Sequence, residues 1–238
     1  MVVVLGALAT SGGGAAVAAA LAEVGLQGVV VDRRARGESG DSGPYAPERE
    51  AEDLAAVIDA VGGRAAVLGH SSGAVLALFA AAEGVPVTQL FLSEPPFRFG
   101  VDEPPADLPD RLQALVDRGD SDAAVVLFQR EGVGLSEPFI EQIRNSAMFE
   151  DLVPLAQSTV YDAILTRTVS SPTPAMRAVS IPVTILRGEP TYPMLVTAAE
   201  RLAAAMPAAE LVVVPESHDH DFDPEATARE ISRRLEGR

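Results

Sequence analysis

The feature that most constrains the fold is a regular alternation of short apolar runs with longer amphipathic stretches. The amphipathic stretches have helical periodicity, as in Pro47–Val61, which ends at a pair of glycines. Continuous apolar runs bounded by Gly, Asp or Pro are typical of parallel strands buried on both faces. The alternation predicts an α/β fold with a doubly wound, mostly parallel sheet of about six strands. The six runs are Val2–Leu5, Val29–Val31, Ala65–Leu68, Leu90–Leu92, Ile181–Leu186 and Leu211–Val214.

One long segment departs from this alternation. Residues 95–180 contain no convincing strand, only short helical patterns separated by Pro and Gly, such as Leu108–Arg118 and Pro138–Ala147. We interpret the segment as a helical cap inserted into a single domain whose core is formed by residues 1–94 and 181–238. The alternative is ordinary helical packing with no part in substrate binding.

Composition excludes several classes of function. A net charge of −16 argues against nucleic acid and anionic membranes as partners, because both require a basic face. The chain contains neither cysteine nor lysine, so disulfides, thiolate metal sites and Schiff-base chemistry are excluded. No apolar run approaches the roughly 20 residues of a membrane span, and the N-terminus does not read as a signal peptide. We therefore expect a cytoplasmic protein with a small-molecule substrate.

The sequence Gly69-His70-Ser71-Ser72-Gly73 matches the G-x-S-x-G pattern. It lies between a predicted strand, Ala65–Leu68, and an apolar helical stretch, Ala74–Ala82. A serine on such a turn sits in a strained conformation, and the helix N-terminus behind it favours an oxyanion. We predict Ser71 as a nucleophile. The alternative is that the glycines merely permit a tight strand-to-helix turn.

A serine nucleophile needs a base, and the chain has three histidines. His70 lies inside the turn itself. His218 and His220 follow the last predicted strand, in a loop that leaves the same edge of a parallel sheet as the serine turn. We predict His218 as the base. The His-Asp-His triplet also suggests a metal site, but it lacks further ligands at suitable spacing, and no metal is predicted.

Together these elements resemble the α/β-hydrolase family over nearly the whole chain. The resemblance is carried by the Val4–Leu8 turn, the Asp32–Ser39 segment, the Gly69–Gly73 elbow, the cap and the late histidine loop. It implies an oxyanion hole formed by the backbone N–H groups of Ala7 and Ser72, and no cofactor. The Asp32–Ser39 segment is a loop typical of the family, which we interpret as structural.

The resemblance also implies that the usual first two strands are missing, since Met1 stands directly at the strand with the oxyanion turn. The Val29–Val31 strand is then expected at a sheet edge. Because an exposed apolar edge invites pairing with another chain, we expect a homodimer or a covering segment.

The acid partner of the histidine is not at the family's usual position. That position, the third residue after Gly188, is Thr191. Two carboxylates are alternatives: Glu189 in the same loop, and Glu94 after the strand that follows the elbow helix. We predict Glu94, because Pro190 restricts the backbone of Glu189 and a buried carboxylate requires a partner. A dyad without an acid is the remaining alternative.

These residues predict a cofactor-independent serine hydrolase acting on a small-molecule ester, lactone or similar carbonyl compound. Two alternatives remain: a non-hydrolytic enzyme on the same scaffold, such as a lyase, cyclase or cofactor-free oxygenase, and a catalytically dead binding protein. The candidate pocket walls, each of which could equally belong to the core, are Phe97, Phe99, Phe128, Met148, Phe149, Tyr161 and Tyr192.

Overall fold

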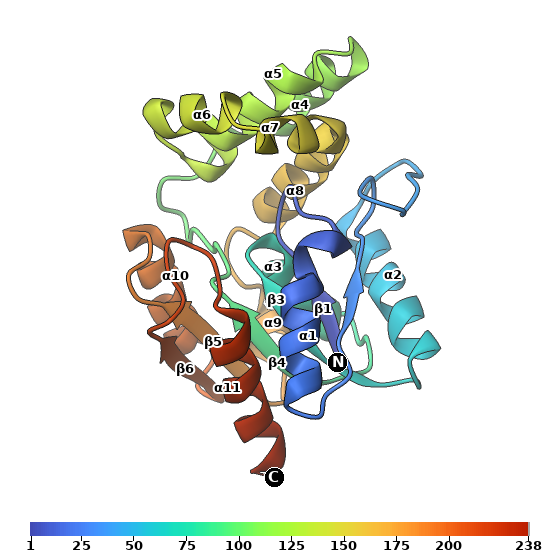
Figure 1. The fold of residues 1–238 in the computed structure, drawn as a ribbon, viewed down its shortest axis with the longest axis vertical. Coiled ribbons are helices and arrows are strands. Elements are labelled where there is room, and N and C mark those ends of the chain that lie inside the picture. Colours follow the sequence, from blue (N-terminus) through green and yellow to red (C-terminus); the bar gives the residue numbers. More distant parts are fainter. Residues whose placement is uncertain (238) are drawn as a thin grey trace.

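The computed structural model describes residues 1–237 and contains one six-stranded sheet with helices on both faces (Figure 1). All strands are parallel, in the order β2-β1-β3-β4-β5-β6. The predicted α/β fold with about six strands is confirmed. The strands are β1 (Val2–Val4), β2 (Val29–Val31), β3 (Ala65–His70), β4 (Val87–Ser93), β5 (Val183–Gly188) and β6 (Ala209–Val214).

Two layers of helices cover the sheet. A short 3-10 turn, η1 (Ser11–Gly14), leads into α1 (Ala15–Glu23), which packs beside α11 (Pro224–Glu236) on one face. The opposite face carries the helices of the main apolar cluster. These are α2 (Pro47–Ala60), α3 (Ser72–Ala82), α9 (Pro174–Arg177) and α10 (Pro193–Ala205).

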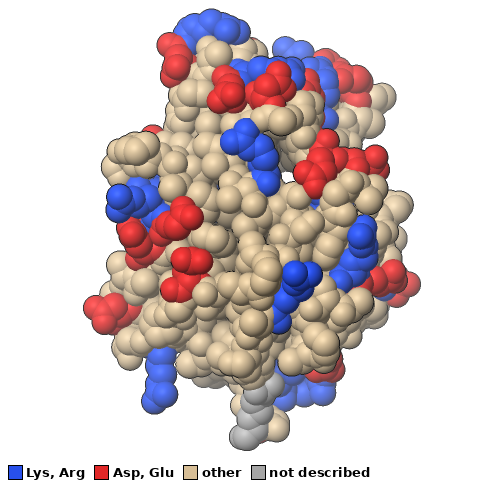
Figure 2. Space-filling model, turned by 180° about the vertical axis from the view of Figure 1, so that it is seen from behind, with Lys and Arg blue, Asp and Glu red and all other residues tan. Residues whose placement is uncertain are grey.

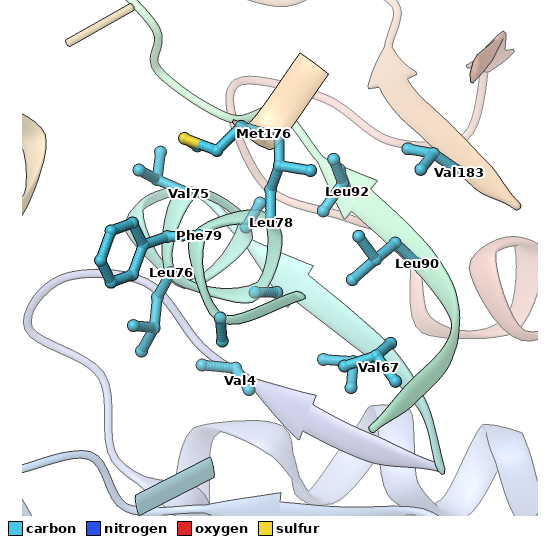
Figure 3. Packing of buried hydrophobic residues seen from close by; sticks show 14 of the residues in the cluster. Val4, Val67, Val75, Leu76, Leu78, Phe79, Leu90, Leu92, Met176 and Val183 are labelled. Carbon is cyan, nitrogen blue, oxygen red and sulfur yellow. The ribbon is translucent and has the colours of Figure 1, made fainter. Parts of the chain in front are cut away.

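Helix α3 lies at the centre of the main core. It is apolar on all sides, which is typical of a helix that is completely surrounded by protein. Figure 3 shows its side chains packed against residues of β1, β3 and β4 and against Met176 of α9. The helix that begins directly after Ser71 is therefore held firmly in place. The labelled members of this cluster include Val75, Leu76, Leu78 and Phe79 of α3 and Val4, Val67, Leu90 and Leu92 of the strands.

The segment between β4 and β5 is helical. Most of its helices lie beyond one end of the sheet, and α8 reaches back towards α3 (Figure 1). They enclose a separate apolar cluster that includes Leu112, Val125 and Val160. Besides α9, the elements are α4 (Leu108–Asp117), α5 (Ser121–Leu127), the π-helical turn η2 (Phe128–Val133), α6 (Glu137–Arg144), α7 (Met148–Leu152), η3 (Val153–Leu155) and α8 (Ala156–Thr168).

Strand β2 forms one edge of the sheet and pairs only with β1. Its three valines are half-buried, and the turn before α1 packs on it so closely that a side chain at Gly14 would collide with Val30. A homodimer, or a segment that covers this edge, stays a prediction. Light scattering tests it: a monomer in which the Val29–Val31 edge is bare to solvent would contradict it.

The surface seen in Figure 2 carries acidic and basic side chains interspersed among uncharged ones. Over residues 1–237, no helix combines the length and the apolar character needed to cross a membrane.

Candidate active site

The G-x-S-x-G segment forms a sharp turn between β3 and α3. Ser71 has φ 53° and ψ −126°, a strained conformation for a residue with a side chain. The flanking glycines leave room for close approach: a Cβ on Gly69 would lie 2.5 Å from Cα of Ala74, and one on Gly73 would collide with the carbonyl of Val4. The strand–turn–helix context predicted from the sequence is therefore present.

The histidine that faces Ser71 is His220, and the prediction of His218 for this position is wrong. His220 Nε2 lies 2.9 Å from Ser71 Oγ. His218 is exposed, and its Nδ1 lies 3.2 Å from the carbonyl oxygen of Glu189. The loop conformation causes the difference: Asp219 and His220 both adopt positive φ, and the N–H of Asp219 donates to the carbonyl of Pro190.

The carboxylate that contacts this histidine is Glu94. Its Oε2 lies 2.8 Å from His220 Nδ1, and its side chain is 3% exposed. The Gly188 N–H donates to Oε1 at 2.9 Å, and the Thr191 hydroxyl donates to Oε2 at 3.0 Å. Burial alone would raise the pKa of Glu94, but the hydrogen bonds from His220, Gly188 and Thr191 outweigh it and hold the pKa below the ordinary glutamate value. The carboxyl is therefore an anion near neutral pH.

Neither Thr191 nor Glu189 occupies the position of the acid partner of His220. Thr191, at the family's usual acid position, donates a hydrogen bond to Glu94 instead. Glu189 is exposed, and its backbone carbonyl, not its carboxylate, lies near His218. The sequence does not indicate the supporting contact from Thr191, because that contact depends on where Glu94 lies in space.

The ring of His70 lies next to the ring of His220, the candidate base. Its ring centroid is 4.9 Å from that of His220 and 5.0 Å from that of Phe222. Burial, with the nearby His220, lowers the pKa of His70 to about 3. A neutral His70 places no positive charge beside His220 when the latter takes a proton.

The residues of the two expected oxyanion donors, Ala7 and Ser72, lie close to Ser71. Gly6 brings the turn after β1 against the nucleophile, since a Cβ on Gly6 would lie 2.7 Å from Ser71 Cβ. Ala7 follows it, and Ser72 is the first residue of α3, where backbone N–H groups have no partner within the helix. Both residues line the same cavity as Ser71.

That cavity has a volume of about 1370 Å³ and lies between the carboxyl ends of the central strands and the helices after β4. Among the expected pocket walls, Phe128 and Tyr192 line it, whereas Phe97 is buried in the main core and Tyr161 stacks on Tyr45. Acidic side chains outnumber basic ones around it. The apolar lining includes Leu8, Val17, Phe128, Leu135, Phe139, Leu195 and Phe222.

The sequence matches the profile of the alpha/beta hydrolase family over residues 6–230, and the chain belongs to that family. A search of the curated proteins found no match.

Among solved structures, the chain is similar to an alpha/beta hydrolase from Sphaerobacter thermophilus. The two are 38% identical, with 98% of this chain and 91% of that chain covered and a TM-score of 0.89. E-2-(acetamidomethylene)succinate hydrolase is 23% identical, with coverages of 99% and 91% and a TM-score of 0.62. The monoacylglycerol lipase of Paleococcus ferrophilus is 17% identical, with coverages of 98% and 92% and a TM-score of 0.64. The last two likenesses show the fold alone.

Proposed function

We propose that this chain is a cofactor-independent serine hydrolase acting on a small-molecule ester, lactone or similar carbonyl compound. The observation that carries the proposal is the continuous hydrogen-bonded series from Glu94 through His220 to Ser71, which we call the candidate triad. Its order along the chain, Ser then acid then His, is the order expected of this fold.

Each member has a role in acylation. The Glu94 carboxylate accepts a hydrogen bond from His220 Nδ1–H, which leaves the Nε2 lone pair directed at Ser71. As Ser71 Oγ attacks the carbonyl carbon, its proton passes to Nε2. The carbonyl oxygen becomes an oxyanion that the N–H groups of Ala7 and Ser72 stabilise. The tetrahedral intermediate then expels the alcohol, which takes the proton from His220 and leaves an acyl ester on Ser71.

Deacylation repeats these steps with water. His220 takes a proton from water as the water oxygen attacks the acyl carbon. Collapse of the second intermediate returns that proton to Ser71 Oγ and releases the carboxylic acid. No step requires a metal ion or cofactor.

The cavity favours an uncharged substrate with an apolar acyl or alcohol part. It is larger than the roughly 300–1,000 Å³ of most ligand pockets, and its walls are mainly aliphatic and aromatic. The acidic side chains around it, such as Asp102, Glu103 and Asp221, disfavour anionic substrates.

A fluorophosphonate probe followed by peptide mapping tests the nucleophile. Covalent label on Ser71, lost in Ser71→Ala, is the expected result, together with turnover of p-nitrophenyl butyrate. Absence of label on Ser71 in folded protein would contradict the proposal and favour a dead binding protein. Label on Ser71 without turnover of any aryl ester or lactone would favour a lyase, cyclase or oxygenase.

A further inference from the structure

A second group of charged side chains lies beneath the elbow and takes no part in the candidate triad. It consists of Arg33, Arg36, Glu50 and Asp162, which we call the Asp162 network. All four residues are buried, with exposed fractions from 5% for Arg33 to 0% for Asp162. They come from the loop after β2, from α2 and from α8. Two guanidinium groups and two carboxylates balance in charge.

The Asp162 carboxylate joins both arginines. Its Oδ1 accepts from Arg33 Nη1 at 2.9 Å, and its Oδ2 accepts from Arg36 Nη2 at 2.5 Å. Arg33 also forms a bidentate pair with Glu50, at 2.9 and 2.8 Å. Bidentate pairing of this kind fixes orientation as well as distance.

The network reaches one oxyanion donor through Gly6. Arg36 Nη1 donates to the carbonyl oxygen of Gly6 at 2.6 Å. The peptide bond between Gly6 and Ala7 is planar, and in its trans form the Ala7 N–H points opposite to the Gly6 carbonyl. Holding that carbonyl therefore sets the direction of the Ala7 N–H.

The network reaches the other donor through Ser72. The Ser72 hydroxyl donates to Asp162 Oδ1 at 2.7 Å and accepts from Arg33 Nη1 at 3.0 Å. These two hydrogen bonds hold the Ser72 hydroxyl, and with it the residue whose backbone N–H is the second donor. Ser72 is 3% exposed. One carboxylate thus connects both donors, directly to Ser72 and through Arg36 to Gly6.

We propose that Asp162 is a positioning residue that sets the geometry of the oxyanion hole from helix α8. It acts through Arg36 and Ser72, and the inference rests on the proposed hydrolase function. Because α8 belongs to the helical segment that encloses the cavity, the seating of that segment on the sheet is coupled to the alignment of the two N–H groups.

Stability alone does not account for the network. Buried ion pairs contribute little net stability, since desolvation of the charges offsets their attraction. Within residues 1–237, Arg36 Nε has no hydrogen-bond partner, which adds a cost. Burial would raise the pKa of Asp162, but Arg36 and Arg33 hold it below the ordinary aspartate value, so the carboxylate remains charged.

The main test is the charge-balanced double variant Asp162→Asn/Arg36→Met. We expect kcat for p-nitrophenyl butyrate to fall about 10- to 100-fold with KM changed by less than about threefold, because misalignment of oxyanion donors weakens transition-state binding more than substrate binding. Affinity for phenylboronic acid, whose adduct with serine places a negative oxygen in the oxyanion hole, should fall by a similar factor. The matched control is Arg34→Met/Asp53→Asn, which removes an exposed bidentate pair from the same loop and α2.

Ser72→Ala provides a second test that removes no charge. We expect a fall in kcat of about 3- to 10-fold with KM unchanged, since one of the two connections is lost. This variant decides the question if the double variant does not fold. Values of kcat and boronate affinity within twofold of the control in folded variants would overturn the inference and leave the network a purely structural one. If the wild-type protein neither hydrolyses the ester nor binds boronate, the proposed function fails, and this inference with it.

Discussion

The candidate triad and the Asp162 network meet at the adjacent residues Ser71 and Ser72, yet they are built differently. Each triad residue follows a strand of the sheet and adopts positive φ: 53° at Ser71, 45° at Glu94 and 68° at His220. The four residues of the Asp162 network all lie outside the positive-φ region, and two of them are on helices. His220 is partly open to the cavity, whereas the Asp162 network is closed to solvent.

This contrast separates the two groups that would react, Ser71 and His220, from the groups that support them; Glu94, whose side chain is 3% exposed, supports His220. Atoms that react need access to the substrate, and strained turns at the ends of strands present them there at a cost in stability. Groups that only position others can be buried completely, because they never contact the substrate. Substitutions in the triad should therefore remove activity and preserve the fold, whereas breaking the network should lower both.

The largest effect is expected from Ser71→Ala, with the neighbouring Ser72→Ala as the matched variant. Loss of the nucleophile should reduce kcat by about 10⁴-fold or more, while Ser72→Ala, which keeps the backbone N–H, should cost at most about tenfold. Steady-state kinetics with an aryl ester and thermal unfolding of both variants measure this. Equal losses in the two variants would remove the distinction between reacting and supporting residues.

The second comparison is His220→Ala against His218→Ala. Removal of the base should cost about 10³- to 10⁴-fold in kcat, because Ser71 then has no proton acceptor. His218 is exposed and bonds only to the Glu189 carbonyl, so its loss should change kcat by less than about threefold. A large loss in His218→Ala with an active His220→Ala would restore the assignment made from the sequence.

The third comparison is Glu94→Gln against Glu189→Gln. A glutamine at position 94 keeps the shape but removes the charge that favours the reactive tautomer and the imidazolium of His220. We expect kcat to fall about 10²- to 10⁴-fold. Glu189→Gln should behave like the wild type across the pH–rate profile. If Glu94→Gln retains wild-type kcat, the site works as a dyad.

The smallest effect concerns stability as a function of pH. The pKa of Glu94 is lowered on folding, so its charged form stabilises the native state above about pH 4.3, the ordinary glutamate pKa. That contribution is lost as the pH falls through the lower, folded-state pKa. The difference in unfolding free energy between the wild type and Glu94→Gln should therefore narrow between pH 6 and pH 3. Denaturant unfolding at several pH values measures this difference in unfolding free energy. A difference that grows as the pH falls would contradict a lowered pKa of Glu94 in the folded state.

Local patterns in the sequence were sufficient to predict the sheet and the strand–turn–helix elbow that carries Ser71. The apolar runs coincide with the strands apart from their ends; for example, the run from Ile181 corresponds to a strand that starts at Val183, after a proline that cannot donate a ladder hydrogen bond. The elbow is also local, because its glycines, strand and helix are contiguous. The place of Glu94 could also be predicted from the sequence, because chain order puts it directly after a strand that lies beside the elbow strand.

Only the tertiary structure decided between His218 and His220 and revealed the Asp162 network. The two histidines are two residues apart in one loop, and the choice depends on positive-φ backbone at Asp219 and His220 and on a contact with Pro190 from another loop. Asp162 lies 129 residues from Arg33 in sequence, and nothing in the pattern around either residue indicates the pairing. The physical reason is the range of the interactions: periodicity and turn chemistry act over a few residues, whereas loop conformation and buried ion pairing depend on segments that meet only after the chain has folded.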